Sequence, residues 1–435
     1  MVKKREMNLD ELYADDPERA DAIVFGRISD KVTRRGFVSG LATMSALVGG
    51  EIVFSKFLPQ GMMPVAYGAK SFTIPGKDKG LTILNDRPVN AEVPPHLLND
   101  KITPNNRMFV RNNGIPPKNT SASSWKITFA GEALKAPVTM GLRDIQKKFP
   151  KVTRQIWVEC GGNGRAFYNP PAGGNQWTYG AVGCPVWTGV RLRDVLDSLN
   201  INYQDVVSVG YKGADTHISG QKGKDAISRA MLLEKAMDDN TLIAWEMNGD
   251  DIPEMNGAPV RLVTPGVPGS FSGKWLSEVL VRNIMHDGTK MRGSGYRMPY
   301  YPVAPGTKVD KKHMTLLQEM PVKSLITSFK SGDKHSINKT LNVAGHAWTG
   351  EQNITGVDVS IDFGQTWHKA ALTEAANPFA WQHFGAQVNF PRRGYYEVWA
   401  RATDNTGKMQ PPSTPGWNPK GYANNMIHRI AVNVV

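Results

Sequence analysis

Apolar and polar residues alternate along this chain in two different patterns. Over residues 85–310, short runs rich in β-branched and aromatic residues are interspersed with short helical patches. The strand-like runs include 125–129 and 153–158, and the helical patches include 141–145 and 192–196. This mixture predicts an α+β fold with a mixed sheet.

The C-terminal part of the chain has a purely strand-like pattern. Runs 323–329, 354–361 and 394–404 alternate apolar and polar positions, and turn residues separate them. Strict alternation with regular turns is typical of a β-sandwich, here one of about seven strands. We therefore expect an α+β domain over 69–320 and a β-sandwich domain over 321–435.

The segment before these domains has the features of an export signal. A polar leader precedes the residues Thr-Arg-Arg-Gly-Phe-Val at 33–38, and a weakly apolar stretch follows at 40–50. This pattern resembles a twin-arginine signal, which would occupy residues 1–68 and direct the protein to the periplasm through the twin-arginine export machinery. Because Glu51 and Lys56 make the region before a cleavage site polar, uncleaved anchoring also remains open. A short amphipathic helix is the alternative to a signal.

Composition and charge limit the function classes. The 435 residues are 40% hydrophobic and 21% charged, which is typical of a globular protein. The net charge of +13 would attract anionic substrates and acidic partners. The basic residues are scattered and form no recognition helix or finger spacing, so we do not expect nucleic-acid binding.

A single cysteine is the most informative residue. Cys160 is one of only two cysteines, and it lies in the run Glu-Cys-Gly-Gly-Asn-Gly-Arg at 159–165. A thiolate is a soft ligand for transition metals, and the glycines would let backbone approach a bulky cofactor. Arg165 would add positive charge beside the metal, which suggests chemistry on a small anion. The competing interpretation is a Cys160–Cys184 disulfide, which is common in exported proteins.

Beyond this run, several segments resemble the molybdenum-cofactor core of the sulfite oxidase family. The first matches are Cys160–Arg165, Trp177–Gly183 and Trp187–Leu196. Further matches are Thr103–Asn113, which precedes them in the chain, and Ala244–Gly249, Gly257–Gly266 and Gly273–Leu276, which follow them. The segment Trp417–Tyr422 is similar to the end of the family's dimerisation domain. The resemblance implies a sulfite-oxidase-like molybdopterin-binding domain followed by an Ig-like β-sandwich dimerisation domain.

The resemblance also implies site residues. The cofactor would be molybdenum–molybdopterin with Cys160 as the metal ligand. The other residues expected to contact the cofactor are Asn112, Asn113, Asn256, Arg261, Gly273 and Lys274, of which Arg261 and Lys274 would hold the pterin phosphate. The residues expected to contact the substrate are Arg111, Arg165, Trp177, Tyr296 and Lys420. Two guanidiniums can bind a divalent oxyanion bidentately in a way that lysine cannot.

Three positions depart from the family pattern. The family often has histidine where Asn113 and Asn256 stand, and the animal oxidases have arginine where Lys420 stands. Lysine keeps the positive charge but loses the planar fork of a guanidinium. The residues themselves also allow more ordinary roles. Arg111 and Arg165 could form surface ion pairs, and Trp177 and Tyr296 could belong to a hydrophobic core.

The implied function is oxidation of sulfite to sulfate in the periplasm by a homodimer. The sequence contains no Cys-x-x-Cys-His run and no nucleotide-binding fingerprint, so we expect no haem in this chain and a separate c-type cytochrome as electron acceptor. One alternative within the family is the molybdenum subunit of a sulfane dehydrogenase from a thiosulfate-oxidising system. An alternative of another class is a non-catalytic Ig-like binding protein with the Cys160–Cys184 disulfide.

Overall fold

Two five-stranded sheets form most of the first part of the described chain. The computed structural model describes residues 72–435, so the expected signal at 1–68 lies outside the described residues. One sheet has the order β15-β14-β10-β7 with β16 paired to β14, and the other has the order β13-β11-β17-β5-β6. Strands β17 and β5 pair in parallel whereas the other pairs are antiparallel, so the predicted mixed sheet is confirmed.

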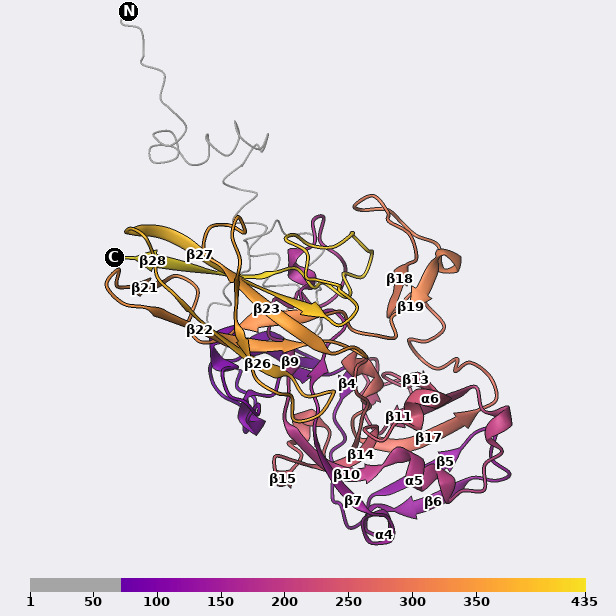
Figure 1. The fold of residues 1–435 in the computed structure, drawn as a ribbon. Helices are drawn as coiled ribbons and strands as arrows, with labels where there is room; N and C mark the ends of the chain where they lie inside the picture. Colours follow the sequence, from indigo (N-terminus) through magenta and orange to yellow (C-terminus); the bar gives the residue numbers. More distant parts are fainter. Residues whose placement is uncertain (1–71) are drawn as a thin grey trace, which may run out of the picture. The chain divides into compact units, whose positions relative to one another are not determined.

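These sheets are built from short strands (Figure 1). The first contains β7 (Lys151–Gln155), β10 (Val186–Arg191), β14 (Leu242–Met247), β15 (Asp250–Asp251) and β16 (Arg261–Val263). The second contains β5 (Lys126–Ala130), β6 (Val138–Gly141), β11 (Ser208–Gly213), β13 (Ala230–Leu232) and β17 (Leu276–Arg282). The helices are α4 (Leu142–Lys148), α5 (Leu192–Asp197) and α6 (Leu233–Ala236), of which α4 and α5 coincide with the two predicted patches.

Smaller sheets complete this part of the fold. The three-stranded sheet consists of β1 (Thr82–Asp86), β2 (Val89–Glu92) and β3 (Val110–Arg111). The two-stranded pairs are β4 (Gly114–Ile115) with β12 (Thr216–His217), β8 (Val158–Glu159) with β9 (Val182–Gly183), and β18 (Arg297–Pro299) with β19 (Met314–Leu316). Within residues 72–435, none of the helices has the length and apolar character needed to span a bilayer.

One predicted strand is divided in two. The sequence predicts continuous extension over 153–158, whereas β7 ends at Gln155 and β8 begins at Val158. Between them the Trp157 N–H donates to the carbonyl of Phe379 at 3.1 Å, so the chain leaves its sheet and contacts the C-terminal domain. This change of partner places the residues after Val158 next to β9.

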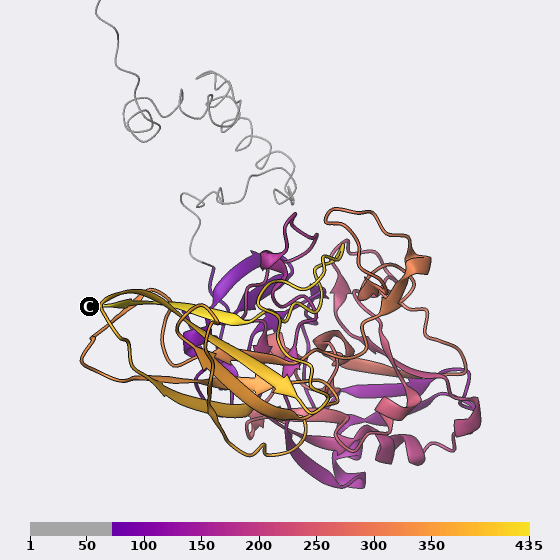
Figure 2. The same cartoon turned by 45° about the horizontal axis from the view of Figure 1, so that its top comes forward.

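The C-terminal domain is a two-sheet sandwich whose long strands stay together in both views, coloured orange to yellow (Figure 1 and Figure 2). One sheet has the order β20-β22-β26-β25 and the other β21-β28-β27-β23-β24. The strands are β20 (Lys323–Ile326), β21 (Asp333–His335), β22 (Leu341–Trp348), β23 (Ile354–Ser360), β24 (His368–Lys369), β25 (Ala371–Leu372), β26 (Gln382–Val388), β27 (Gly394–Asp404) and β28 (His428–Val434). The sandwich has more strands than the seven expected, because strands as short as β24 and β25 are too short to show alternation in the sequence.

The alternation that predicted the sandwich is the pattern that fills its core. Val398, Ala400 and Ala402 of β27 are buried, and so are Ile430 and Val432 of β28. Alternate residues of a strand point to the same face of a sheet, so these side chains share the layer between the two sheets. Residues of both sheets form one apolar cluster there.

A second apolar cluster is shared by the two domains. It includes Trp157, Cys160 and Trp177 of the first domain together with Trp348 and Trp381 of the sandwich. The sandwich therefore contributes side chains to the packing around the cysteine loop.

A buried ion pair also joins the domains. The carboxylate of Glu159, the residue before the cysteine, accepts bonds from Lys323 of β20 at 2.5 Å and from the Trp348 indole at 2.9 Å. The Asn163 amide donates to the same carboxylate at 2.9 Å. Burial makes an unpaired charge costly, so removing one partner of such a pair destabilises a protein strongly.

We expect the substitution Lys323→Met to lower the free energy of unfolding by about 3–5 kcal/mol, because it leaves the Glu159 carboxylate buried without its cation. Urea unfolding followed by tryptophan fluorescence measures this change. The exposed Lys330, which follows the same strand, provides the control Lys330→Met. A loss below 1 kcal/mol in the Lys323 variant would show that the pair does not hold the domains together.

Buried histidines make stability depend on pH. Burial lowers the pKa of His346 and that of His428 from 6.5 to about 3. The His428 Nδ1 accepts the Ile326 N–H at 3.0 Å, a bond that protonation of this nitrogen would break. The folded protein keeps both rings neutral while the unfolded chain takes up protons below pH 6.5, so the free energy of unfolding falls as the pH decreases from 6.5 towards 3.

We expect the midpoint urea concentration of unfolding to be clearly lower at pH 5.0 than at pH 7.5 in wild type. The fall should be smaller in His428→Gln, because the amide keeps an acceptor but does not titrate. Comparing the two pH values within each variant cancels the direct cost of the substitution. His368→Gln, at an exposed histidine of β24, is the control and should behave as wild type. If the midpoint of the His428 variant fell as much as that of wild type, His428 would not be a source of the pH dependence.

Candidate active site

The Cys160 loop is fixed by backbone bonds and by one asparagine. Cys160 follows β8, and its N–H donates to the carbonyl of Ala181 at 2.9 Å. The Asn163 N–H returns to the Cys160 carbonyl at 2.8 Å, and the Asn163 side chain bonds the backbone of both Tyr179 and Ala181. A loop held in this way presents the thiol in a defined position.

The glycines of this loop make room for other side chains of the protein. A Cβ at Gly162 would lie 2.2 Å from the Arg165 guanidinium, and one at Gly164 would lie 2.8 Å from Asn424. Gly164 also has φ 91°, which L-residues rarely adopt. The sequence interpretation, in which the glycines admit a cofactor, is therefore incomplete, because two of them are needed for packing within the chain.

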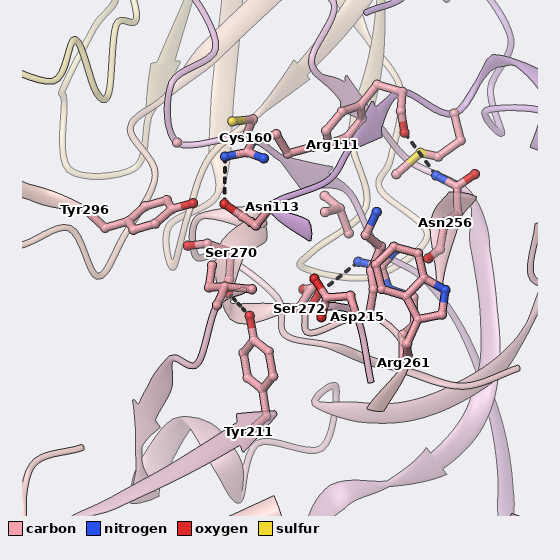
Figure 3. Close-up of a pocket in the computed structure, with 18 residues that line it drawn as sticks. Arg111, Asn113, Cys160, Tyr211, Asp215, Asn256, Arg261, Ser270, Ser272 and Tyr296 are labelled. Atoms are coloured by element: carbon pink, nitrogen blue, oxygen red, sulfur yellow. Dashed lines mark hydrogen bonds between the residues drawn. The ribbon is translucent and has the colours of Figure 1, made fainter. Parts of the chain in front are cut away.

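A pocket brings together seven of the residues expected in the site (Figure 3). Its lining includes Arg111, Asn113, Cys160, Asn256, Arg261, Lys274 and Tyr296. These residues lie far apart in sequence, on β3, after β8, on β16 and in the connecting loops. In Figure 3 the Tyr296 hydroxyl points into the space between Cys160 and Ser270.

The two asparagines that stand where the family often has histidine accept hydrogen bonds from lysines. The Asn113 side-chain oxygen accepts from Arg111 at 2.9 Å and also from Lys290. The Asn256 side-chain oxygen accepts from Lys77 at 2.5 Å. A protonated imidazole has no acceptor for such bonds. The amides therefore suit positions that are surrounded by cationic donors.

Arg261 and Lys274 lie together on one side of the pocket. The Arg261 guanidinium donates to the carbonyls of Asn256 at 2.7 Å and Ser272 at 3.0 Å, and burial lowers its pKa to about 10. Lys274 donates to Asn112 and to the carbonyl of Met255 at 2.8 Å. Burial lowers the pKa of Lys274 well below its ordinary value, and the Arg261 guanidinium lowers it further.

The charge of this pocket is unbalanced. Among the described residues that line it, Asp215 is the only carboxylate, whereas Arg111, Arg261 and Lys274 are basic. Burial lowers the pKa of Lys77 to about 7 and that of Lys290 to about 8, and both lysines bond pocket amides. Buried cations without counter-ions are costly, and a bound anion removes the cost.

The donor set therefore fits the molybdenum–molybdopterin cofactor. Cys160 would hold the metal through its thiolate, the soft ligand that such a metal accepts. Arg261 and Lys274 would neutralise the pterin phosphate, and Asn113 and Asn256 would hydrogen-bond the pterin.

Two of the residues expected to bind substrate, Arg165 and Lys420, are not among the residues that line the pocket. Arg165 is buried, and its guanidinium donates to the carbonyls of Lys420 at 2.7 Å and Asn175 at 2.8 Å. It lies 5.3 Å from the ring centroid of Tyr422. Lys420 thus enters this region through its carbonyl, and neither side chain is among the residues that line the pocket.

The remaining expected residues lie behind the lining. Trp177 is wholly buried and packs edge-on against the pocket residue Phe109, with 6.4 Å between ring centroids. Asn112 contacts the pocket through its side-chain oxygen, which accepts from Lys274, and through its carbonyl, which accepts from Arg111. A Cβ at Gly273 would lie 2.3 Å from the ring of Tyr211, so this glycine lets that ring close on the pocket.

The disulfide alternative is wrong. Cys160 and Cys184 are both buried and both free. The Cys184 sulfur accepts the Trp381 N–H at 3.5 Å, and burial raises the pKa of its thiol to about 12. Cys184 is therefore an unreactive core residue, since the thiolate is the reactive form.

The sequence does not single out Tyr211 and Asp215, which line the pocket, or Lys77 and Lys290, which bond its amides. Lys77 and Lys290 each bond one of the unusual asparagines, while the Tyr211 hydroxyl donates to the carbonyl of Ser270 at 2.5 Å. None of them lies in a recognisable motif. For the two lysines there is an indirect signal, because an amide oxygen in place of a histidine can accept a hydrogen bond from a cation.

Comparisons with known proteins agree with this geometry. The family model described as "Oxidoreductase molybdopterin binding domain" matches residues 113–290, and the one described as "Mo-co oxidoreductase dimerisation domain" matches residues 314–435. The solved structure of the sulfane dehydrogenase SoxCD from Paracoccus pantotrophus superposes with a TM-score of 0.64 at 24% identity, covering 89% of this chain and 99% of that one. At this identity the likeness shows a common fold.

Two animal enzymes are similar over most of their length. The chain is 32% identical to mitochondrial sulfite oxidase of Rattus norvegicus over 377 residues, which cover 83% of this chain and 67% of the relative. It is 31% identical to sulfite oxidase of Gallus gallus, covering 82% of this chain and 78% of the relative. The chain therefore belongs to the sulfite oxidase family of molybdenum-cofactor oxidoreductases.

Proposed function

We propose that this protein oxidises sulfite to sulfate in the periplasm and passes the electrons to a separate c-type cytochrome. Sulfite and water give sulfate, two protons and two electrons. Two oxidised haems accept one electron each. The bound molybdenum cofactor would supply the two-electron redox chemistry, whereas the chain binds and orients the anion.

One observation carries the proposal: the Cys160 thiol, the Arg111 guanidinium and the Tyr296 hydroxyl line one pocket that contains an excess of basic groups. A small dianion has the charge that such a pocket lacks. The relatives named sulfite oxidase support sulfite as that anion. The alternative, a sulfane substrate carried on a protein, would need the same metal ligand.

The side chains would act mainly by replacing water around the anion. The Arg111 guanidinium presents several donors in one plane and forms charge-assisted bonds to oxyanions. The Tyr296 hydroxyl would donate a further bond to the anion. Because these donors are fixed before the substrate arrives, they stabilise charge without reorganising, an effect worth about 3 kcal/mol per donor in favourable cases.

The acceptor and the assembly are part of the proposal. The net charge of +13 would favour encounter with an acidic cytochrome. The match of residues 314–435 to a dimerisation domain supports a homodimer formed through the sandwich. Periplasmic export rests on the twin-arginine pattern at 33–38.

We expect purified wild-type protein to contain about one molybdenum per chain and to reduce cytochrome c when sulfite is added. Cys160→Ser should lose this activity by at least about 100-fold, because a hydroxyl is a poor ligand for a metal that prefers thiolate. Metal analysis by mass spectrometry and cytochrome absorbance measure the two quantities. The matched control Cys184→Ser changes the other cysteine and should remain active.

The outcomes separate the competing functions. A wild type without molybdenum, or an active Cys160→Ser variant, would contradict the proposed site. A molybdenum-loaded wild type that oxidises a protein-bound sulfane and leaves sulfite unchanged would contradict the proposed substrate and support the sulfane dehydrogenase alternative.

We expect Arg111→Met to raise the KM for sulfite by about 10- to 100-fold, since a hydrogen bond to a charged group contributes about 1.5–3 kcal/mol. Steady-state kinetics at constant ionic strength measures this change. The control Arg143→Met removes an exposed guanidinium from α4 and should leave the KM within about twofold. Equal KM values in the two variants would remove Arg111 from the binding site.

A further inference from the structure

Behind the Tyr296 wall of the pocket, five side chains form a continuous stack. The Arg229 guanidinium lies 4.3 Å from the ring centroid of Phe271 and 4.3 Å from that of Tyr296. Tyr296 stacks on Tyr422 with 5.3 Å between centroids and 8° between planes. Arg165 lies beyond Tyr422, 5.3 Å from its ring centroid. Two stacked tyrosines are thus enclosed between two guanidiniums.

Arg229 is an unusual buried cation. It has no exposed surface, and it forms no ion pair with any carboxylate in residues 72–435. Its Nη1 donates to the carbonyl of Lys290 at 3.3 Å, whereas its Nε and Nη2 are buried and have no hydrogen-bond partner among the described residues. Native proteins satisfy nearly all buried polar groups, so such an arrangement calls for an explanation.

The aromatic rings explain how the charge is tolerated. A guanidinium over the face of a phenol is attracted by the negative π-density, and the attraction grows when both groups are desolvated. Stability alone does not require this residue, because a methionine would fill the same space between the two rings without a desolvation cost. The positive charge is retained next to a tyrosine whose hydroxyl enters the pocket.

We propose that Arg229 is a positioning residue of the oxyanion pocket, which holds the Tyr296 ring in place and makes its hydroxyl a stronger hydrogen-bond donor to the bound anion. The cation attracts electron density of the ring and so increases the positive charge on the hydroxyl hydrogen. The Tyr422 ring supports the opposite face, and its hydroxyl accepts the Tyr296 N–H at 3.2 Å. Tyr296 has φ 55°, so its backbone needs such support to keep its conformation.

The inference rests on the proposed function only in taking sulfite as the substrate, because any small oxyanion would bind the same donor. Sulfate, the proposed product, is therefore a suitable probe that requires no turnover. Its binding to molybdenum-loaded protein is measured by calorimetry, and the KM and kcat for sulfite are measured separately.

The test compares charge with volume at position 229. Arg229→Met keeps the stem and removes the charge, and we expect it to raise the dissociation constant of sulfate and the KM for sulfite about tenfold while kcat changes less than threefold. Arg229→Lys keeps a cation over the ring and should restore both constants to within about threefold of wild type. Should the methionine variant fail to load molybdenum, Arg229→Gln repeats the comparison, because its amide is uncharged.

The control is another arginine stacked on a ring. Arg401 of β27 lies 3.9 Å from the ring centroid of Trp367 and pairs with Asp358. Arg401→Met should leave sulfate binding unchanged, although it removes the same kind of cation–π contact.

A double-substitution cycle shows whether Arg229 acts through Tyr296. In a Tyr296→Phe background the hydroxyl is absent, so Arg229→Met should weaken sulfate binding by less than threefold. An equal effect in both backgrounds, a wild-type constant in Arg229→Met, or a wild type that binds no sulfate would each overturn the inference. Arg229-dependent sulfate binding without sulfite oxidation would instead uphold the inference and reject the proposed reaction.

Discussion

The carboxylate of Glu159 is the group on which the arrangement of the site depends. It immediately precedes Cys160, it has no exposed surface, and its bonds come from Asn163 in the cysteine loop and from Lys323 and Trp348 in the sandwich. A buried carboxylate needs such partners, because desolvation costs several kcal/mol per ion. Because these partners come from both domains, the C-terminal domain helps to hold the cysteine loop in its observed conformation.

A second constraint is the number of cations around the pocket. Their like charges are kept at tolerable cost by neutral acceptors: Asn113 accepts from Arg111 and Lys290, and Asn256 accepts from Lys77. These bonds orient the cations but do not cancel their charge, because an amide oxygen carries only a partial charge. The remaining positive charge is available to an anionic cofactor and an anionic substrate. Burial is the main reason why the pKa values of Lys77, Lys274 and Lys290 are lowered, and neighbouring guanidiniums add to the effect for Lys274 and Lys290.

Much of the fold and part of the site could be predicted from sequence. The sandwich followed from alternation, since a strand with one buried face leaves a period of two. Cys160 and Arg111 were found because each lies in a contiguous run that resembles a family motif. Contacts between distant segments left no such trace: the division of the predicted strand at 156–157 depends on a bond to Phe379.

The same limit applies to Lys77, Lys290 and Arg229, which reach the site from separate loops. Each is one basic residue among 52 in the chain, and nothing in its neighbours distinguishes it from a solvated lysine or arginine. Asn113 and Asn256, which accept from the two lysines, depart from the family pattern in sequence. The lysines that bond them can be identified only from the fold.

The residue at position 420 contributes to this region through its backbone. The contact that the structure uses there is a backbone carbonyl, which accepts from Arg165 at 2.7 Å and is present whatever the side chain. The adjoining Gly421 has φ 57°, and a Cβ on it would lie 2.6 Å from Arg165, so the backbone of this turn is fitted to the buried guanidinium. What lysine lacks is the planar fork. Arg229, on the far side of the two tyrosines, has that planar geometry and is buried, so it places a guanidinium from a different part of the chain behind the Tyr296 wall of the pocket.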